Sequence, residues 1–109
     1  MVKKILTVAG FVEGETFEET QFISPPRTTY AVYHDSFTRR GADGFNLLKE
    51  HDYTIELYSD FPDLEAESRI EEALDAHGIE YDKDDRIWIQ SEQLYEVVYS
   101  FEYIEKIGG

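Results

Sequence analysis

The sequence contains no cysteine, only three prolines and a single tryptophan in 109 residues. Without cysteine there are no disulfide bonds, no thiolate metal sites and no cysteine nucleophile, and this composition suits a reducing compartment. Basic residues are also few, because 10 lysines and arginines stand against 24 aspartates and glutamates, a formal net charge of −14. Proteins bind nucleic acid through basic groups that displace counterions from phosphates, so this balance argues against a protein that wraps DNA or RNA.

Long apolar runs are missing as well. The first residues, MVKKILTVAGFVEGE, hold two lysines and a short apolar run, but acidic residues interrupt it and no small-residue cleavage site follows. No stretch of the chain approaches the roughly 20 apolar residues of a spanning helix. We therefore expect a soluble protein, made in the cytoplasm and not associated with a membrane.

The acidic residues that are present gather in one quarter of the chain. Between Asp60 and Asp85 there are eleven acidic and two basic residues, a net charge of −9. The simpler interpretation is a solvated face. The more specific interpretation is a surface that keeps DNA or a like-charged partner from adhering.

Local patterns in the first half of the chain predict two strands preceded by an irregular arm. Pro25 and Pro26 cannot lie in a helix interior or a central strand, so the acidic segment that they close is predicted to be an arm or long loop. Alternation of Tyr53, Ile55 and Leu57 with other residues predicts a half-buried strand. The elements predicted here, in order, are a short helix or strand at 2–10, the arm at 12–27, a strand at 28–35, a loop at 36–44, a helical turn at 46–50 and a strand at 53–59.

The second half begins with the clearest helix. Asp60 is the predicted N-cap, Pro62 suits the first turn and Gly78 ends the helix. Apolar residues at helical spacing are predicted to face the core, namely Ala66, Ile70, Ala73 and Leu74. Polar residues are predicted to face water, namely Glu65, Glu67, Arg69, Glu71, Glu72 and Asp75. The remaining elements are a hairpin of 79–81 and 86–90 around a polar turn at 82–85, and a long last strand at 94–105.

Together these elements predict a single domain that spans residues 1–109. Hydrophobic residues make up 41% of the chain and aromatic residues 15%, which is enough for one modest core. The predicted fold class is α+β, a mostly antiparallel β-sheet with one main helix packed across it and a long irregular arm near the N-terminus.

Three histidines are the first candidates for catalysis or metal binding. His34-Asp35 and His51-Asp52 repeat a dipeptide that some metal-dependent phosphohydrolases use, but both pairs are predicted at strand ends and not on the helices of a bundle. We therefore interpret them as polar strand ends. The alternative, a hydrolase built on these four residues, would require metal in the purified protein. His77 falls in the last helical turn, where a cation interacts well with the helix dipole.

Other motifs of catalysis are missing from the sequence. The run at 82–85 resembles part of a calcium loop, but Ile87 and Gln93 occupy the positions that need glycine and glutamate. A hairpin turn explains these aspartates better. Nucleophile elbows, P-loops and dinucleotide fingerprints are absent from the sequence. We therefore predict that the protein is not an enzyme and uses no cofactor or metal.

Aromatic residues near the C-terminus have two interpretations. Tyr95 and Tyr99 belong to one face of the last strand, and Trp88 lies between Ile87 and Ile89. The first interpretation is packing under the helix. The second is a subunit interface, where aromatic residues are enriched and charge is depleted, and it makes Trp88, Tyr95 and Tyr99 candidate interface residues.

The segment 33–43, YHDSFTRRGAD, is the other candidate contact. Arg39 and Arg40 are the only adjacent basic pair after the N-terminus. In so acidic a subunit, these two arginines have a candidate target in the carboxylate-rich stretch 60–85 of an identical neighbour, through bidentate arginine–carboxylate contacts. Asp43, in the same segment, is a further candidate interface residue. The alternative is a solvated loop.

Much of the chain resembles a known family. The stretches FEETQFISPPRTTYAVYHD, RRGADGFNLLKEHDYTIELYSD and RIWIQSEQLYEVVYSFEYIEK, within residues 17–106, resemble the tail terminators, or head–tail joining proteins, of long-tailed bacteriophages and prophages. The resemblance implies an α+β subunit of a hexameric ring that caps the tail tube, stops its polymerisation and meets the head connector. DNA would pass through the lumen without specific binding. The protein would assemble in the host cytoplasm and remain in the tail or neck of the virion.

The composition agrees with this family and with one alternative. An acid-rich surface around a lumen would repel DNA, and arms and unpaired strands suit ring closure by head-to-tail contacts. The alternative is a small acidic binding module, antitoxin-like or a DNA mimic, that neutralises a basic partner. It shares the charge of a ring subunit, but it would remain a monomer or dimer and would co-purify with a basic protein.

Overall fold

The computed structural model describes residues 1–40 and 48–106, and within them the chain forms two helices and one six-stranded sheet. The order of elements is α1 (Val2–Val8), β1 (Phe17–Glu19), β2 (Tyr30–Arg40), β3 (Leu48–Ser59), α2 (Leu64–Ala76), β4 (Asp82–Lys83), β5 (Ile87–Ile89) and β6 (Leu94–Lys106). The strand order is β1-β2-β3-β6-β4, and β5 also pairs with β6. Only the β1–β2 pairing is parallel among these strands. The predicted α+β class with a mostly antiparallel sheet is confirmed.

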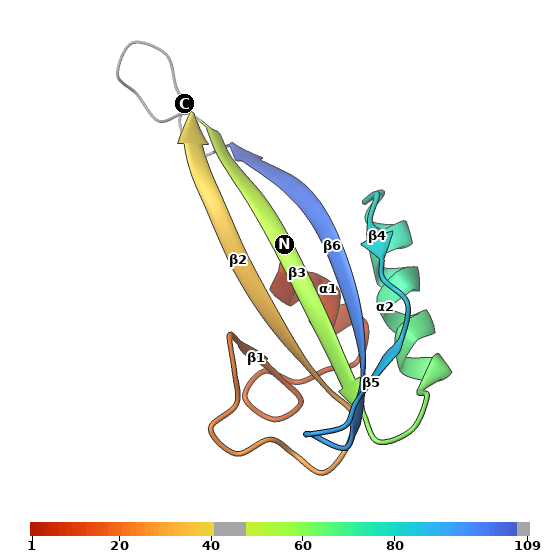
Figure 1. Cartoon of the computed structure of the whole chain (residues 1–109). Coiled ribbons are helices and arrows are strands. Elements are labelled where there is room, and N and C mark those ends of the chain that lie inside the picture. Colours follow the sequence, from red (N-terminus) through yellow and green to blue (C-terminus); the bar gives the residue numbers. More distant parts are fainter. Residues whose placement is uncertain (41–47, 107–109) are drawn as a thin grey trace.

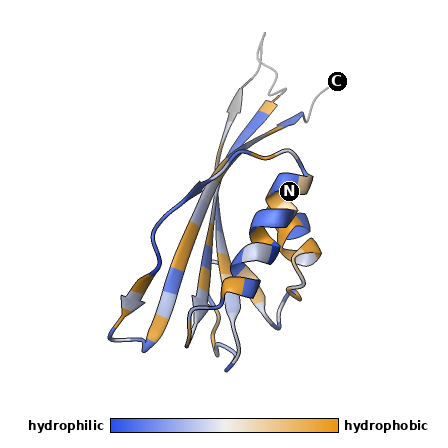
Figure 2. Cartoon of the chain, turned by 90° about the vertical axis from the view of Figure 1, so that its right-hand side faces the viewer, coloured by the Kyte–Doolittle hydropathy of each residue, from blue (hydrophilic) through white to orange (hydrophobic). Residues whose placement is uncertain are grey.

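Both helices cover the same face of the sheet, as Figures 1 and 2 show. The prediction of one main helix is therefore incomplete, because α1 also buries Val2, Ile5 and Leu6 against the sheet and α2. Arg69 of α2 joins the two helices by donating a hydrogen bond from Nε to the Ala9 carbonyl at 2.8 Å. We call the opposite face of the sheet the helix-free face.

The core lies between the helices and the sheet. Alternate residues of the strands point toward the helices because side chains alternate along a strand. The same alternation places polar residues on the helix-free face, together with Tyr30, Val32 and Tyr58 at the end of the sheet near β1. The largest fully buried side chains are Ile5, Leu6, Phe17, Ile55, Leu57, Ile70, Leu74 and Tyr99. Each such aliphatic side chain contributes about 1.5–3 kcal/mol through burial.

The predicted arm at 12–27 is partly wrong. Phe17 is only 1% exposed, and it begins β1, in which it is the register partner of Ala31. The Thr16 hydroxyl accepts a hydrogen bond from the Val12 amide at 2.8 Å, which closes a tight turn ahead of this strand. A strand of three residues carries too short an alternation to be recognised in the sequence, and it forms here because β2 supplies its hydrogen bonds. The chain from 20 to 29 contains neither helix nor strand.

The two central strands are longer than predicted. β2 continues to Arg40 and β3 begins at Leu48, and these two residues are register partners. Residues 36–40 therefore form strand in place of the predicted loop, and residues 48–50 form strand in place of the predicted helical turn. The remaining residues of the two predicted elements, 41–44 and 46–47, lie outside the described part of the chain. Polar side chains on both faces hid this strand extension in the sequence.

The helix α2 follows the predicted apolar pattern but starts later. Its N-cap is Asp63 and not Asp60, because the Asp63 carboxylate accepts a hydrogen bond from the Ala66 amide at 3.0 Å. Gly78 follows the helix with φ of +67°, a backbone conformation that favours glycine. The four predicted core positions of α2 are buried, whereas Glu67, which was predicted to face water, is only 3% exposed.

The predicted hairpin after α2 is wrong. β4 and β5 do not pair with each other, because each adds separately to the outer edge of β6. Asp82 is the register partner of Ser100, and Ile87 is the register partner of Glu96. Of the three aspartates in the predicted turn at 82–85, Asp82 belongs to β4, and Asp84 and Asp85 lie in the link between β4 and β5.

Candidate assembly surfaces

The far ends of the three long strands project beyond the rest of the fold. Figure 1 shows β2, β3 and β6 continuing together past α1, β1 and β4. We call this part the distal ribbon and define it as residues 34–40 of β2, 48–54 of β3 and 101–106 of β6. Their registers place β3 between the other two strands throughout.

Both outer edges of the distal ribbon are open within residues 1–40 and 48–106. β1 pairs with β2 only up to Tyr33, so no described strand lies beside 34–40. β4 pairs with β6 only at Tyr99 and Ser100, so no described strand lies beside 101–106. The outward backbone groups of such edges are templates for another strand.

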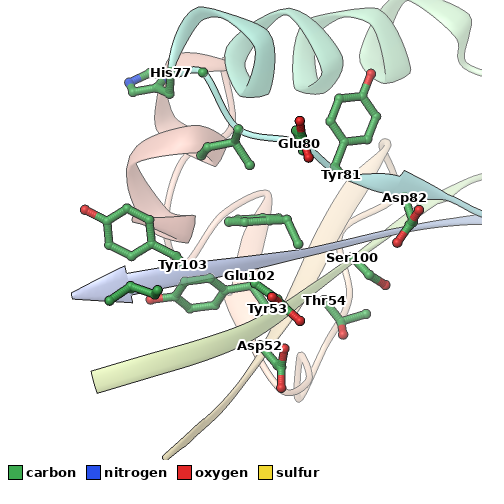
Figure 3. Close-up of a pocket in the computed structure, with 14 residues that line it drawn as sticks. Asp52, Tyr53, Thr54, His77, Glu80, Tyr81, Asp82, Ser100, Glu102 and Tyr103 are labelled. Atoms are coloured by element: carbon green, nitrogen blue, oxygen red, sulfur yellow. The ribbon is translucent and has the colours of Figure 1, made fainter. Parts of the chain in front are cut away.

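A groove follows the open edge of β6. Its volume is about 1030 Å³, and it lies between β6 and the segment that leads from α2 to β4. Figure 3 shows this segment, with His77, Glu80 and Tyr81, on one side and Tyr103 of β6 on the other. The chain comes from α2 through residues 77–81 and joins the sheet only at Asp82, where β4 begins. The groove is the space between this linking segment and β6.

A histidine clamped by two carboxylates holds the distal ribbon together. His51 of β3 is 5% exposed, with Nδ1 at 2.7 Å from Asp35 Oδ1 on β2 and Nε2 at 3.1 Å from Glu105 Oε1 on β6. Its ring stacks on Tyr53 with centroids 4.8 Å apart. One side chain thus connects all three strands.

The charges of this cluster act on its neighbours. The hydrogen bond from His51 lowers the pKa of the Glu105 carboxyl below its ordinary value. Burial, with the nearby Asp35 charge as a second cause, raises the pKa of Tyr53 to about 12. Tyr53 therefore stays neutral beside a carboxylate at physiological pH.

The interpretation of the histidine-aspartate pairs as polar strand ends is wrong. All four residues lie inside β2 and β3, and His34 contacts Glu56 across the sheet at 2.9 Å. Asp52 is exposed on the helix-free face, opposite to His51. Among the described residues no group of three or more histidines and carboxylates is arranged to hold a metal ion.

The helix-free face of the sheet is acidic. Five carboxylates share it by strand register, namely Glu50, Asp52, Glu56, Glu96 and Glu102. Glu56 and Glu96 lie outside the distal ribbon, where Glu56 contacts His34 at 2.9 Å and Glu96 accepts a hydrogen bond from the Tyr58 hydroxyl at 2.7 Å. Asp52 and Glu102 are exposed and are register partners in the distal ribbon. This face is therefore a second acidic surface besides the one predicted at 60–85.

Part of the predicted acidic stretch at 60–85 is structural. The buried Glu67 carboxylate contacts Lys83 Nζ at 2.9 Å and Arg86 Nη2 at 2.8 Å. Glu71 contacts the same lysine at 2.8 Å and accepts a hydrogen bond from the Tyr99 hydroxyl at 2.7 Å. These contacts bind α2 to β4 and β6. The Glu67 and Glu71 carboxylates are therefore not available to a neighbouring subunit.

This network shifts the titration of its members. Burial alone would raise the pKa of the Glu71 carboxyl, but hydrogen bonds from Lys83 and Tyr99 bring it below its ordinary value. Burial alone would lower the pKa of Lys83, but its two glutamate partners raise it. Burial and the hydrogen bond to Glu71 raise the pKa of Tyr99. All three groups therefore keep their ordinary charge states at neutral pH.

The three aromatic residues predicted at an interface differ in exposure: Tyr99 is buried, whereas Trp88 and Tyr95 are accessible. Tyr99 is completely buried in the core, so the prediction that it contacts a neighbouring subunit is wrong. Trp88 is 43% exposed on β5, its ring centroid lies 4.8 Å from that of half-buried Tyr95, and its indole N–H donates to Gln90 at 3.0 Å. Trp88 and Tyr95 thus form a small accessible aromatic patch.

The predicted arginine contact lies at the end of the distal ribbon. The backbones of Arg39 and Arg40 form the last two positions of β2, where Lys49 and Leu48 are their register partners. Their side chains and the whole of Asp43 lie outside the described part of the chain. Sequence reasoning missed His51 as a strand connector, although the period-two pattern around it was a signal for a longer strand.

A scan against protein-family models finds no match for the chain, and a search of curated proteins finds none either. Within residues 1–40 and 48–106, neither helix has the length and apolar character needed to cross a membrane. Two open strand edges and an acidic helix-free face are therefore the features from which the function is inferred.

Proposed function

We propose that this protein is a structural subunit of a ring at the top of a phage tail, a tail terminator or head–tail joining protein. The observation that carries the proposal is the distal ribbon with one open edge on each side. The resemblance of residues 17–106 to that family supports the same role. The absence of a recognisable catalytic motif in the sequence is consistent with it.

The two open edges favour a ring over a two-fold dimer. One edge belongs to β2 and the other to β6, so a contact between them joins different surfaces of two identical copies. Such a head-to-tail contact repeats from copy to copy and closes into a ring when the rotation per copy divides a full turn. A hexamer is the size that the family resemblance implies.

The acidic helix-free face suits the lumen of such a ring. Both helices cover the other face of the sheet, so they would form the outer wall. Carboxylates such as Asp52 and Glu102 would then point toward the passing DNA. Repulsion between these carboxylates and the DNA phosphates would keep the DNA from adhering to the lumen. A conduit needs this if the genome is to slide through it.

A second candidate function is supported by the same carboxylates. An acidic protein that neutralises a basic partner would also present an exposed face with few cations, as the helix-free face does. This candidate predicts a monomer or dimer that binds a basic protein in a salt-dependent manner. It assigns no role to the open strand edges.

The proposal is tested on tails and on the purified chain. In a phage that encodes this protein, a nonsense mutation should give overlong tails or tails that are not joined to heads in electron micrographs. The purified chain should form rings when it is mixed with tail tubes and should stop their growth. Uniform tails joined to heads in the mutant phage would contradict the proposal.

A further inference from the structure

We propose that the open edge of β6 receives the open edge of β2 from the next copy, as a parallel strand that enters the groove beside Tyr81 and Tyr103. This inference rests on the proposed function and names the joint of the ring. The receiving edge is 101–106 and the inserted edge is 34–40. Both edges lie in the described part of the chain without a strand partner.

The direction of the strands agrees with a rotation. β2 and β6 both run antiparallel to β3, so they run parallel to each other within one subunit. If neighbouring copies are related by rotation about an axis parallel to these strands, the strands run in the same direction in both copies. Across the joint, β2 of one copy therefore pairs parallel with β6 of the next, and the sheet continues from subunit to subunit.

The groove lies where the incoming strand of the next copy would pair with β6. β4 begins at Asp82 beside Ser100, and no described strand continues its line along 101–106. The incoming strand would take up that line. Tyr81, which packs on Tyr99 with ring centroids 5.9 Å apart, marks the inner end of the groove and stops the added strand there.

The register supplies complementary residues. Through β3, Phe37 shares a rung of the sheet with Tyr103, and Arg39 shares a rung with Glu105. A rotation without a shift along the axis places Phe37 level with the next copy's Tyr103 and Arg39 level with the next copy's Glu105. Aromatic pairs and pairs of opposite charge on one rung stabilise a sheet. Phe37 is 46% exposed in the single subunit, and the joint would cover it.

Cysteine cross-linking tests this joint directly because the chain has no native cysteine. In one subunit Phe37 and Tyr103 are separated by β3, so their strands lie about 9.5 Å apart. A disulfide spans Cα atoms no more than about 7 Å apart, so it cannot form between these positions within one copy. Any bond between cysteines at 37 and 103 must join two copies.

The variant Phe37→Cys/Tyr103→Cys, oxidised with tail tubes present, should give a ladder of covalent oligomers up to the ring size in non-reducing gels. The variant Phe37→Cys/Val8→Cys is the matched control, since Val8 is 58% exposed and belongs to α1, not to either strand of the proposed joint. It should give no species beyond a dimer. A shift of the strand by two residues would move the ladder to Phe37→Cys/Phe101→Cys or Phe37→Cys/Glu105→Cys and would support the joint in that register.

A charge exchange gives a second measurement. Arg39→Glu alone and Glu105→Arg alone should each reduce the assembled fraction in sedimentation, and the double exchange should restore it. Rings in electron micrographs without a ladder in any of the three registers would overturn the joint and leave the proposed function standing. A chain that stays monomeric beside tail tubes and leaves their length unchanged would overturn both.

Discussion

Replacement of His51 by alanine is the most informative single change in the distal ribbon. The imidazole connects β2, β3 and β6, and both of its ring nitrogens face carboxylate oxygens. Its removal takes away the contacts with Asp35 and Glu105 and opens a space beside Tyr53. The strands should therefore separate more easily at this end of the sheet, whereas the core between the helices and the sheet keeps its contacts.

The size of the effect follows from the contacts of the ring. A hydrogen bond to a charged group contributes about 1.5–3 kcal/mol when it is shielded from water, and the Asp35 side chain is only 22% exposed. Stacking on Tyr53 adds about 0.5–1 kcal/mol. The Glu105 carboxylate is well solvated, so its contact adds little. We expect His51→Ala to lower the free energy of unfolding by about 2–4 kcal/mol.

The measurement is urea unfolding of the monomer at pH 7, with His34→Ala as the matched control. His34 lies in the same sheet and also contacts one carboxylate, Glu56, but its side chain is 45% exposed. A loss below about 1 kcal/mol is expected for the control, because exposed ion pairs are weak. Equal losses in the two variants would refute the assignment of His51 as the connector of the ribbon.

The same variant has a distinct effect on titration. The pKa of Glu105 lies below its ordinary value of 4.5 because of the hydrogen bond from His51. A lowered carboxyl pKa stabilises the fold above the ordinary pKa, and this stabilisation is lost as the pH falls through the lowered value. Nuclear magnetic resonance titration should show the Glu105 pKa rising toward 4.5 in His51→Ala. An unchanged Glu105 pKa would contradict the hydrogen bond.

Three further predictions concern the rest of the fold. Glu67→Ala should lower the free energy of unfolding in urea by about 3 kcal/mol, because it leaves Lys83 and Arg86 without their buried partner. Glu65→Ala, at an exposed site on the same helix, is the control and should change this free energy by less than about 0.5 kcal/mol. Because the pKa of Tyr53 is raised to about 12, the stability that it contributes should be constant below pH 10 and should fall as the pH rises toward 12, and urea unfolding from pH 9 to 11 measures this. Phe17→Ala should cost about 3–5 kcal/mol if β1 belongs to the core, and Ile23→Ala, at a fully exposed site, should cost nothing measurable by thermal unfolding.

The helix α2 and the inner halves of the long strands were predictable because each has a strong local period. Ile70 and Leu74 recur at helical spacing, and Ile55 and Leu57 alternate with more polar neighbours, so burial of one face followed directly. These residues obtain their environment from the element to which they belong. Any arrangement of the neighbouring strands and helices had to cover these apolar residues.

The polar contacts were not predictable in the same way. Glu67 looks like any surface glutamate of an acidic helix, yet Lys83 and Arg86 from the following segment neutralise it in a buried site. His51 looks like a polar strand end, yet Asp35 and Glu105 meet it from two other strands. Their partners are distant in sequence, so local pattern carries no information about them.

The sequence by itself determined the class of the protein: an acidic α+β domain with an amphipathic helix and alternating strands, without cysteine chemistry or a recognisable catalytic motif. The tertiary structure decided which edges of the sheet stay open and which carboxylates face water. Register and strand order set both, since they depend on pairing between residues that are far apart in the chain. For that reason the candidate contact moved from the arginine loop and the aromatic residues Trp88, Tyr95 and Tyr99 to the two edges of the distal ribbon. Arg39 and Arg40 form the last positions of one of these edges, on β2.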